Sequence, residues 1–171
     1  LTQNTIHQLD IVEDKNRTKV SKFNSLLGIV NKCSTSIGKR LLVNRILNPI
    51  LDIDILQQRY NMIDLFRQKN EVEIFYNYEY FQSYLKGIID LERSHRKISL
   101  GILEFYQFPT LDSAYENVLS LIDLLHKFTD LHSGNNIDSY SYLLPSEEII
   151  NKFKQFIEDY KSKLNLDIMT T

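Results

Sequence analysis

The sequence is poor in the residues that turn or cross-link a chain. Its 171 residues include five Gly, three Pro, one Cys and no Trp. Scarce turn-forming residues favour long elements over many short strands. The single cysteine, Cys33, excludes a disulfide framework within the chain, and we therefore expect a reducing, intracellular setting.

Long hydrophobic runs are also lacking. No stretch of about 18 apolar residues occurs, so we expect no membrane-spanning helix. The N-terminus shows no secretory leader, and because the chain begins at Leu1 rather than Met we expect it to be a piece of a longer protein. A hydrophobic content of 43% and a charged content of 25% are nevertheless typical of a folded domain.

Acidic residues are absent from one long stretch. Between Lys15 and Leu51 the chain carries eight Lys or Arg and no Asp or Glu, whereas Asp52 to Thr171 carries 12 bases against 19 acids. A basic stretch of this kind can neutralise phosphates without reading a base sequence. Its first bases lie in a polar segment that we expect to be a mobile loop, and they are the candidates for a DNA-proximal position: Lys15, Arg17, Lys19 and Lys22.

The alternative for the basic stretch is architectural. In that interpretation Arg40 or Arg45 pairs with a carboxylate such as Glu92, and the loop is simply a soluble segment. A second basic cluster, within residues 92–97, alternates in sign and favours internal ion pairs over a nucleic-acid surface.

Apolar residues recur at helical spacing through most of the chain. Residues 1–12 lack this period and are expected to be extended, and a short helix is predicted near residues 23–30. Ser34 or Thr35 can cap the next helix, which should run to about residue 48 because Pro49 stops it.

The third predicted helix begins at Asp52 or Asp54. One apolar stripe is expected to face the core: Ile53, Leu56, Tyr60, Ile63 and Phe66. The aromatic-rich residues 72–89 are predicted to be mostly helical, and residues 90–99 form a further helix with Gly101 as its C-terminal cap.

Two longer helices are predicted in the C-terminal part. The first starts at Pro109 and Thr110 and keeps one apolar face: Leu111, Tyr115, Val118, Ile122, Leu125 and Phe128. The last has Pro145 in its first turn and carries a wide apolar stripe between Ile149 and Leu164. Together these patterns predict an all-α fold, a bundle of six or seven helices.

The sequence offers little to a catalytic or metal site. A phosphate loop would read G-x-x-x-x-G-K-[ST], and the nearest match, Cys33 to Arg40, has Gly38-Lys39 but lacks the first Gly and the hydroxyl that binds magnesium. Asp123 and His126 are three apart on a predicted helix, but two ligands are too few for a metal. We therefore expect no catalytic, cofactor or metal site within the chain.

Four motifs follow one another along the chain. The first is Thr5-Ile6-His7-Gln8-Leu9-Asp10-Ile11. The second combines Ser25-Leu26-Leu27 with Thr35-Ser36-Ile37-Gly38-Lys39-Arg40-Leu41-Leu42 and Asn48-Pro49-Ile50. The third is the stretch from Asp54 to Ile63, which contains Arg59, and the fourth is Asp90-Leu91-Glu92-Arg93.

In this order and spacing the motifs resemble the core, or lever, domain (domain III) of MutS-family DNA mismatch repair proteins. The family signature reads S-L-L, T-x-x-G-x-R-x-L, x-P-L, I-x-x-R-x-x-x-V and D-L-E-R, and Asp10 stands where the family usually has Glu. The resemblance covers nearly the whole chain and weakens after Gly101. It implies structural roles for the motif residues: Thr35, Gly38, Arg40, Pro49, Arg59, Asp90, Glu92 and Arg93.

The resemblance implies a scaffold rather than an enzyme. In the family this domain joins an ATPase dimer to a DNA clamp, and signals pass between them by movement of the lever. Gly38 would let two helices pack closely, while Arg40, Glu92 and Arg93 would form ion pairs that orient the lever. ATP and Mg²⁺ are implied only for the parent protein, as are its partners: the ATPase, clamp and connector domains, duplex DNA and a second subunit.

Three parts are expected. Residues 1–22 form an N-terminal segment and mobile basic loop, residues 23–132 form a helical core domain, and residues 133–171 form a loop and a long, protruding lever helix that ascends toward the clamp. The alternative function is a free-standing helical module that binds a partner protein through the apolar stripe of its last helix.

Overall fold

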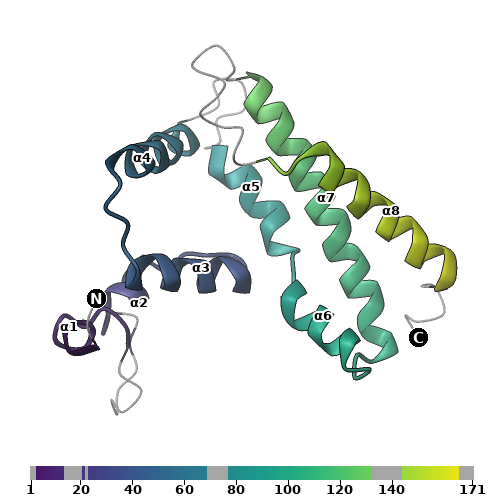
Figure 1. The fold of residues 1–171 in the computed structure, drawn as a ribbon, viewed down its shortest axis with the longest axis horizontal. Helices are drawn as coiled ribbons and strands as arrows, with labels where there is room; N and C mark the ends of the chain where they lie inside the picture. The colour runs from purple at the N-terminus through teal and green to yellow at the C-terminus, as the bar shows by residue number, and fades with distance from the viewer. Residues whose placement is uncertain (1–2, 14–20, 22, 69–76, 132–143, 166–171) are drawn as a thin grey trace. The chain divides into compact units, whose positions relative to one another are not determined.

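The computed structural model describes residues 3–13, 21, 23–68, 77–131 and 144–165, and every regular element within these ranges is helical (Figure 1). The all-α class predicted from the sequence is confirmed. The elements are α1 (Gln3–Gln8), α2 (Leu26–Val30), α3 (Ser36–Leu47), α4 (Ile53–Arg67), α5 (Asn77–Lys86), α6 (Leu91–Ser99), the 3-10 helix η1 (Phe105–Gln107), α7 (Phe108–Leu131) and α8 (Glu147–Lys163).

Contacts divide the chain into two units, Leu1–Leu56 and Gln57–Thr171. Helix α4 begins in the first unit and ends in the second. The domain boundaries expected near residues 22 and 132 border parts of the chain that the structure does not describe, and they stay predictions. Of the described helices, none is both long and apolar enough to cross a membrane.

Helix α1 corrects the expectation that residues 1–12 are extended. It ends in a Schellman motif, in which the N–H of Asp10 donates to the carbonyl of His7 at 3.3 Å and the N–H of Ile11 donates to that of Ile6 at 3.0 Å. Asp10 has a φ of 47°, a left-handed conformation that a short polar side chain tolerates better than a branched one. A helix of only six residues is too short for apolar spacing to reveal it.

The same turn also caps the N-terminus of α2 through its backbone carbonyls. The N–H groups of Leu26 and Leu27 donate to the carbonyls of Asp10 and Ile11 at 2.9 and 3.0 Å. Ser25 is the N-cap, and its hydroxyl accepts from the third N–H of the helix at 3.0 Å. The N–H groups that have no partner inside α2 are thus satisfied from outside it, and two motifs that are separate in the sequence become joined.

Thr35 caps α3, as the sequence predicts. Its Oγ1 accepts from the N–H of Gly38 at 3.0 Å, and the helix ends at its C-cap Asn48, immediately before Pro49. The expectation that Gly38 brings two helices together is corrected. The atoms nearest to a Cβ added at Gly38 are Thr35 Oγ1 at 2.9 Å and Cys33 Cβ at 3.6 Å, so the glycine leaves space for the cap of its own helix.

Helix α7 is the central element of the second unit, where α5 and α6 contact it and α8 lies beside it (Figure 1). Buried side chains form two clusters along α7. The Phe128 cluster consists of Met62, Leu65, Phe81 and Phe128. The Tyr115 cluster consists of Leu111, Tyr115 and Ile157.

Three phenylalanine rings connect α4, α5 and α7. Phe66 stacks on Phe128 at a centroid distance of 5.1 Å, and Phe81 meets the two rings edge-on at 4.9 and 5.4 Å. Both geometries are favourable for aromatic pairs. The Phe128 cluster is therefore held by directional ring contacts as well as by apolar burial.

The buried face of α4 matches the predicted stripe only in part, because Phe66 packs against the Phe128 cluster as predicted. Met62 and Leu65 are buried, whereas Ile53, Tyr60 and Ile63 are exposed. Because α4 carries apolar side chains on more than one side, spacing alone does not select the side that packs. The neighbouring Phe81 and Phe128 rings decide it.

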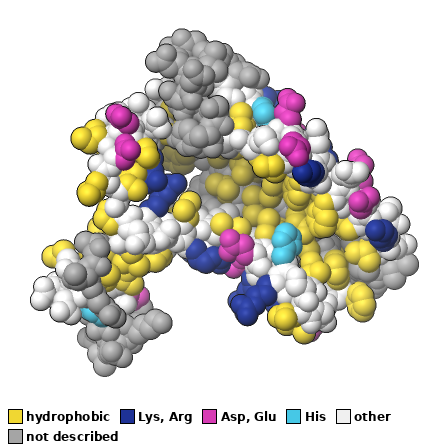
Figure 2. All heavy atoms as spheres, in the orientation of Figure 1, with side chains coloured by type: hydrophobic (Ala, Val, Ile, Leu, Met, Phe, Trp, Pro, Cys, Tyr) yellow, Lys and Arg dark blue, Asp and Glu magenta, His cyan; other side chains and the backbone are white. Residues whose placement is uncertain are grey.

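Helix α8 corrects the expectation of a long, protruding lever. It has 17 residues, about 25 Å at 1.5 Å per residue, whereas α7 has 24. Its Ile157 is buried in the Tyr115 cluster, so α8 packs along α7 (Figure 1). Its N-cap is Ser146, which places Pro145 before the helix and not in its first turn. Figure 2 shows apolar side chains at the surface where these two helices lie, and Ile149 and Phe156 of α8 are exposed.

Ser25→Ala is expected to lower the free energy of unfolding by about 1 kcal/mol, because the third N–H of α2 loses its cap. Ser146→Ala is the matched control, since Ser146 is also an N-cap but its side chain makes no cap hydrogen bond. Guanidinium denaturation of both variants provides the measurement. Equal losses in the two proteins would contradict the role assigned to the Ser25 hydroxyl.

Candidate functional site

The four bases expected near DNA all lie outside the described residues: Lys15, Arg17, Lys19 and Lys22. Their DNA-proximal position stays a prediction. The remaining bases of the acid-free stretch are exposed on or beside α3: Lys32, Lys39, Arg40 and Arg45. Successive helical residues diverge by about 100°, so the three bases of α3 project in different directions and do not form one phosphate-binding stripe.

The two motif arginines before α5 differ in environment. Arg40 is exposed on α3, whereas Arg59 is half-buried on α4. The predicted pairing of Arg40 with Glu92 would join the first unit to the second, and it stays a prediction.

The D-L-E-R motif forms the first turn of α6. Asp90 is the N-cap, and its Oδ1 accepts from the N–H of Arg93 at 3.3 Å. Leu91 packs against the Tyr115 cluster. Glu92 is exposed in the first turn, where the helix dipole favours a carboxylate, and the Arg93 side chain is also exposed. The motif therefore starts the helix and anchors it to the core.

Tyr115 is the largest fully buried side chain of the described residues. Its ring meets Phe153 edge-on at 5.5 Å and lies 5.8 Å from both Phe156 and Tyr160, three residues of α8. Its hydroxyl lies 2.6 Å from Nε2 of His95 on α6, within hydrogen-bond distance. A single residue of α7 thus contacts both neighbouring helices.

A polar cluster joins α7 to α8 near the same place. Lys161 Nζ lies 3.1 Å from Asp112 Oδ1 and 2.5 Å from Glu116 Oε1. The hydroxyl of Tyr160 donates to the same Asp112 oxygen. These four residues are called the Lys161 cluster. Because its two acids lie one turn apart on α7, Lys161 can reach both only when α8 has one particular register along α7.

Burial and hydrogen bonding strengthen proton binding in this region. Burial, and to a lesser extent the charge of Asp112, raises the pKa of Tyr115 to about 12. Burial and then the hydrogen bond to Asp112 raise the pKa of Tyr160. The hydrogen bond to Glu116 raises the pKa of Lys161. The two tyrosines therefore stay neutral and the lysine stays charged well above neutral pH.

The sequence patterns do not predict the Lys161 cluster. The available signal was the spacing of Asp112 and Glu116, which puts two acids on one face of α7. Their partners lie more than 40 residues away, and which residues of α8 meet them depends on the antiparallel register of the two helices. Likewise, nothing in the spacing connected His95 to Tyr115.

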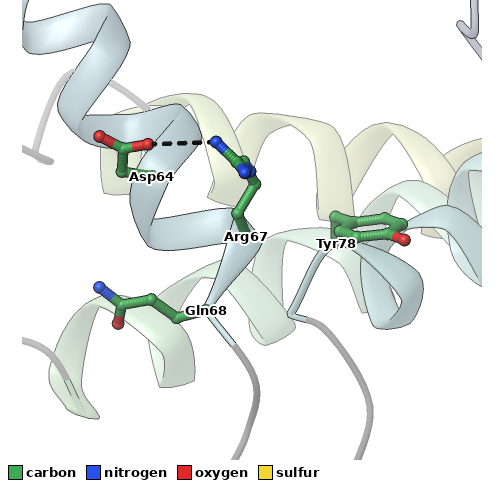
Figure 3. A pocket seen from close by; sticks show the side chains of 4 residues that line it. All are labelled: Asp64, Arg67, Gln68 and Tyr78. Carbon is green, nitrogen blue, oxygen red and sulfur yellow. Dashed lines mark ion pairs between the residues drawn. The ribbon is translucent and has the colours of Figure 1, made fainter.

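A pocket of about 590 Å³ lies where α4 ends and α5 begins. It is lined by Asp64, Arg67, Gln68 and Tyr78. Figure 3 shows Arg67 turned toward Asp64, with which it forms an ion pair at 3.8 Å, while Gln68 points away from this pair. Both charged side chains are more than 70% exposed, and the pocket lining contains no nucleophile paired with a base.

A smaller pocket, about 250 Å³, lies between α7 and α8. It contains the predicted neighbours Asp123 and His126, together with Glu147 and Lys154 from α8. Although Asp123, His126 and Glu147 line one pocket, no three His, Cys, Asp or Glu side chains among the described residues are arranged to hold a metal ion. Cys33 is half-buried beside the first turn of α3, with its N–H donating to Asn31 Oδ1 at 3.3 Å.

Stability is expected to decrease as the pH rises above about 10. A tyrosine in an unfolded chain ionises near pH 10, whereas folded Tyr115 keeps its proton to about pH 12. Its contribution is fully present below about pH 10 and is lost between about pH 10 and 12, because only the unfolded state releases the proton in that window. Tyr115→Phe should therefore flatten the decline in unfolding free energy, measured by guanidinium denaturation across this range.

Tyr60→Phe is the control for this measurement, since Tyr60 is 58% exposed on α4. It should leave the alkaline slope unchanged. Near neutral pH, Tyr115→Phe should also cost about 1 kcal/mol through loss of the hydrogen bond with His95. An unaltered alkaline slope in Tyr115→Phe would show that burial of this hydroxyl does not control the transition.

Comparison with known proteins extends the resemblance noted in the sequence. The family model described as MutS domain III matches residues 4–167. A DNA mismatch repair mutS homolog of Acanthamoeba polyphaga mimivirus is 30% identical over 173 residues, which cover 99% of this chain and 14% of that protein. The MutS protein of Fusobacterium nucleatum is 31% identical over 157 residues, which cover 89% of this chain and 16% of that protein.

A mitochondrial mutS homolog of Sarcophyton glaucum is 35% identical over 126 residues, covering 72% of this chain and 12% of that protein. No solved structure matches the chain. The chain thus spans between 12% and 16% of the length of these relatives. Since the domain III model covers almost all of it, the chain belongs to the MutS family of DNA mismatch repair proteins, in which it is domain III.

Proposed function

We propose that this domain is the non-catalytic core of a MutS-like, ATP-dependent DNA mismatch repair protein, and that it links the ATPase to the DNA clamp. The observation that supports this role is the connection of α6, α7 and α8 through Tyr115 and the Lys161 cluster. Helices packed in this way move together, because a close-packed interface resists continuous deformation. A displacement applied at one end of the α7–α8 pair would reach the other end.

In this proposal ATP and Mg²⁺ bind to other domains of the parent protein. Gly38-Lys39 is the nearest approach to a phosphate loop, but it lies in the first turn of α3, and the N–H of Gly38 already donates to Thr35. The described residues also provide no three-ligand group for a metal ion. The described residues therefore do not fit a nucleotide with its metal, and in this proposal the ATPase chemistry lies in other domains.

The proposed partners are the connector, clamp and ATPase domains of the parent and a second subunit. Duplex DNA would be bound through the clamp. A role in DNA repair implies that the protein acts inside the cell. The many exposed apolar side chains of the first unit, such as Leu26, Ile29 and Val30 on α2, are compatible with contacts to other domains.

A free-standing module that binds a partner through α8 is the second candidate. Its support is the exposure of Ile149 and Phe156 on this helix. However, Ile150 and Ile157 are buried, and Phe153 packs against Tyr115. Most of the apolar stripe is thus used within the second unit, which favours the scaffold role.

The isolated domain is expected to hydrolyse no ATP and to bind DNA only weakly, with an affinity that falls as salt rises. Fluorescence anisotropy with a paired duplex and a mismatched duplex, together with a phosphate-release assay, tests this. Tight binding with preference for the mismatch would contradict the proposal, because mismatch reading would then lie in this domain.

In the full-length parent protein, Tyr160→Phe combined with Lys161→Met is expected to weaken the coupling between nucleotide and mismatched DNA. Allosteric ligands typically change each other's affinity by about 5–150-fold. The ATP-induced change in mismatch affinity should shrink at least about threefold in the double variant, because α8 is no longer fixed in one register along α7. Titrations of mismatched DNA with and without ATP give the ratio directly.

Lys152→Met is the matched control. Lys152 pairs with Glu148 at 2.6 Å, but both residues belong to α8, so the change leaves the α7–α8 connection intact. Coupling should be normal in this variant. Normal coupling in a folded Tyr160→Phe, Lys161→Met protein, or an equal loss in Lys152→Met, would overturn the transmission role.

A further inference from the structure

A dense group of exposed apolar side chains lies where α6 turns into η1. Their exposed fractions range from 40% to 72%, and they are Ile98, Leu100, Ile102, Phe105 and Tyr106. Figure 2 shows apolar side chains at the surface at the lower end of α6, beside Lys and Arg side chains. Isolated exposed apolar residues are ordinary, but a concentrated group marks an interaction surface. This group is called the α6 tip.

Backbone hydrogen bonds fix the α6 tip. Gly101 has a φ of 68°, and its N–H donates to the carbonyl of Ile98 at 2.9 Å. The N–H of Ile102 donates to the carbonyl of Lys97 at 3.0 Å, which completes a Schellman motif. In η1, the N–H of Gln107 donates to Glu104 at 2.9 Å. The apolar side chains are therefore presented by a defined turn, which lowers the entropic cost of binding a partner.

Positive charge borders the α6 tip. Arg96 is exposed in the last turn of α6, and the Nζ of the next residue, Lys97, lies 3.5 Å from Gln107 Oε1 in η1. Glu92 is in the first turn of α6, at the opposite end of the helix. Glu104 precedes η1, and its carboxylate raises the pKa of Tyr106. The helix dipole stabilises bases at the C-terminal end of α6, which explains the position of these bases. It does not explain the exposed apolar side chains beside them.

We propose that the α6 tip docks an acidic segment of a partner protein that presents apolar side chains. Charge complementarity identifies the partner, because Arg96 and Lys97 in the last turn of α6 select Asp or Glu at the edge of the contact. Three of the five apolar residues are aliphatic, and aliphatic side chains do not stack on nucleic-acid bases as aromatic rings do. A protein surface therefore fits the tip better than a single-stranded nucleic acid. This interaction is additional to the linking role proposed above.

The probe for this surface is a fluorescein-labelled synthetic helix of about five turns, with Leu and Phe on one face and Glu along both edges. Its matched partner has Lys in place of every Glu. Binding of both peptides to the 171-residue chain is measured by fluorescence anisotropy. The acidic peptide should bind at least about tenfold more tightly than the basic one.

Substitutions locate the binding surface. Ile102→Ser with Phe105→Ser should weaken binding of the acidic peptide about tenfold, and Arg96→Gln with Lys97→Gln should remove the preference between the peptides. Ile149→Ser is the control, because Ile149 is an exposed apolar residue in the first turn of α8, away from the tip, and it should change the affinity less than about twofold. If the tip double variant does not melt cooperatively, Leu100→Ser serves in its place.

Several results would overturn the proposal. They include equal binding of the two peptides, no binding of either, and wild-type affinity in the tip variants. Tighter binding of single-stranded oligothymidylate that is lost with Phe105→Ser would assign the tip to nucleic acid. Concentration-dependent self-association abolished by the tip variants would assign it to a second copy of the chain.

Discussion

The packing of the second unit depends on the burial of Tyr115. Its ring is covered by Phe153 and Tyr160 of α8, while its hydroxyl reaches His95 of α6. A buried hydroxyl without a partner would cost about 1–3 kcal/mol, so α6 has to place His95 beside α7 for the tyrosine to be tolerated there. The positions of two helices are therefore set by opposite ends of one side chain.

Three polar residues of the family signature share one physical role, and they occur in both units. Ser25, Thr35 and Asp90 each accept a hydrogen bond from the N–H three residues further along. Helices as short as α2 and α6 are marginal alone, so satisfying these N–H groups decides where they begin. In the first unit the backbone carbonyls of Asp10 and Ile11 complete the cap of α2. These three positions of the signature thus mark where helices start.

Helix boundaries that depend on neighbouring residues could be predicted from the sequence, whereas contacts between helices could not. Thr35, Pro49 and Gly101 act through neighbours within a few residues, and their predicted roles as helix boundaries are confirmed. The stripe predicted for α4 is only partly correct, because Phe81 and Phe128, which lie elsewhere in the chain, pack against Phe66, Met62 and Leu65 rather than against Ile63. The Lys161 cluster was missed for the same reason, since ion pairs between helices depend on a register that spacing within one helix does not specify.

Strength and register come from different contacts at the α7–α8 interface. Lys161 and Glu116 are 37% and 52% exposed, and ion pairs this accessible to solvent contribute about 0–1 kcal/mol. Burying an apolar side chain such as Ile157 contributes about 1.5–3 kcal/mol, so apolar packing holds α8 in place. Apolar packing is weakly directional, whereas Lys161 satisfies Asp112 and Glu116 in one register only. A helix held by the first kind of contact and aligned by the second keeps one register, so a displacement of α8 is passed to α7, as the transmission role proposed for this domain requires.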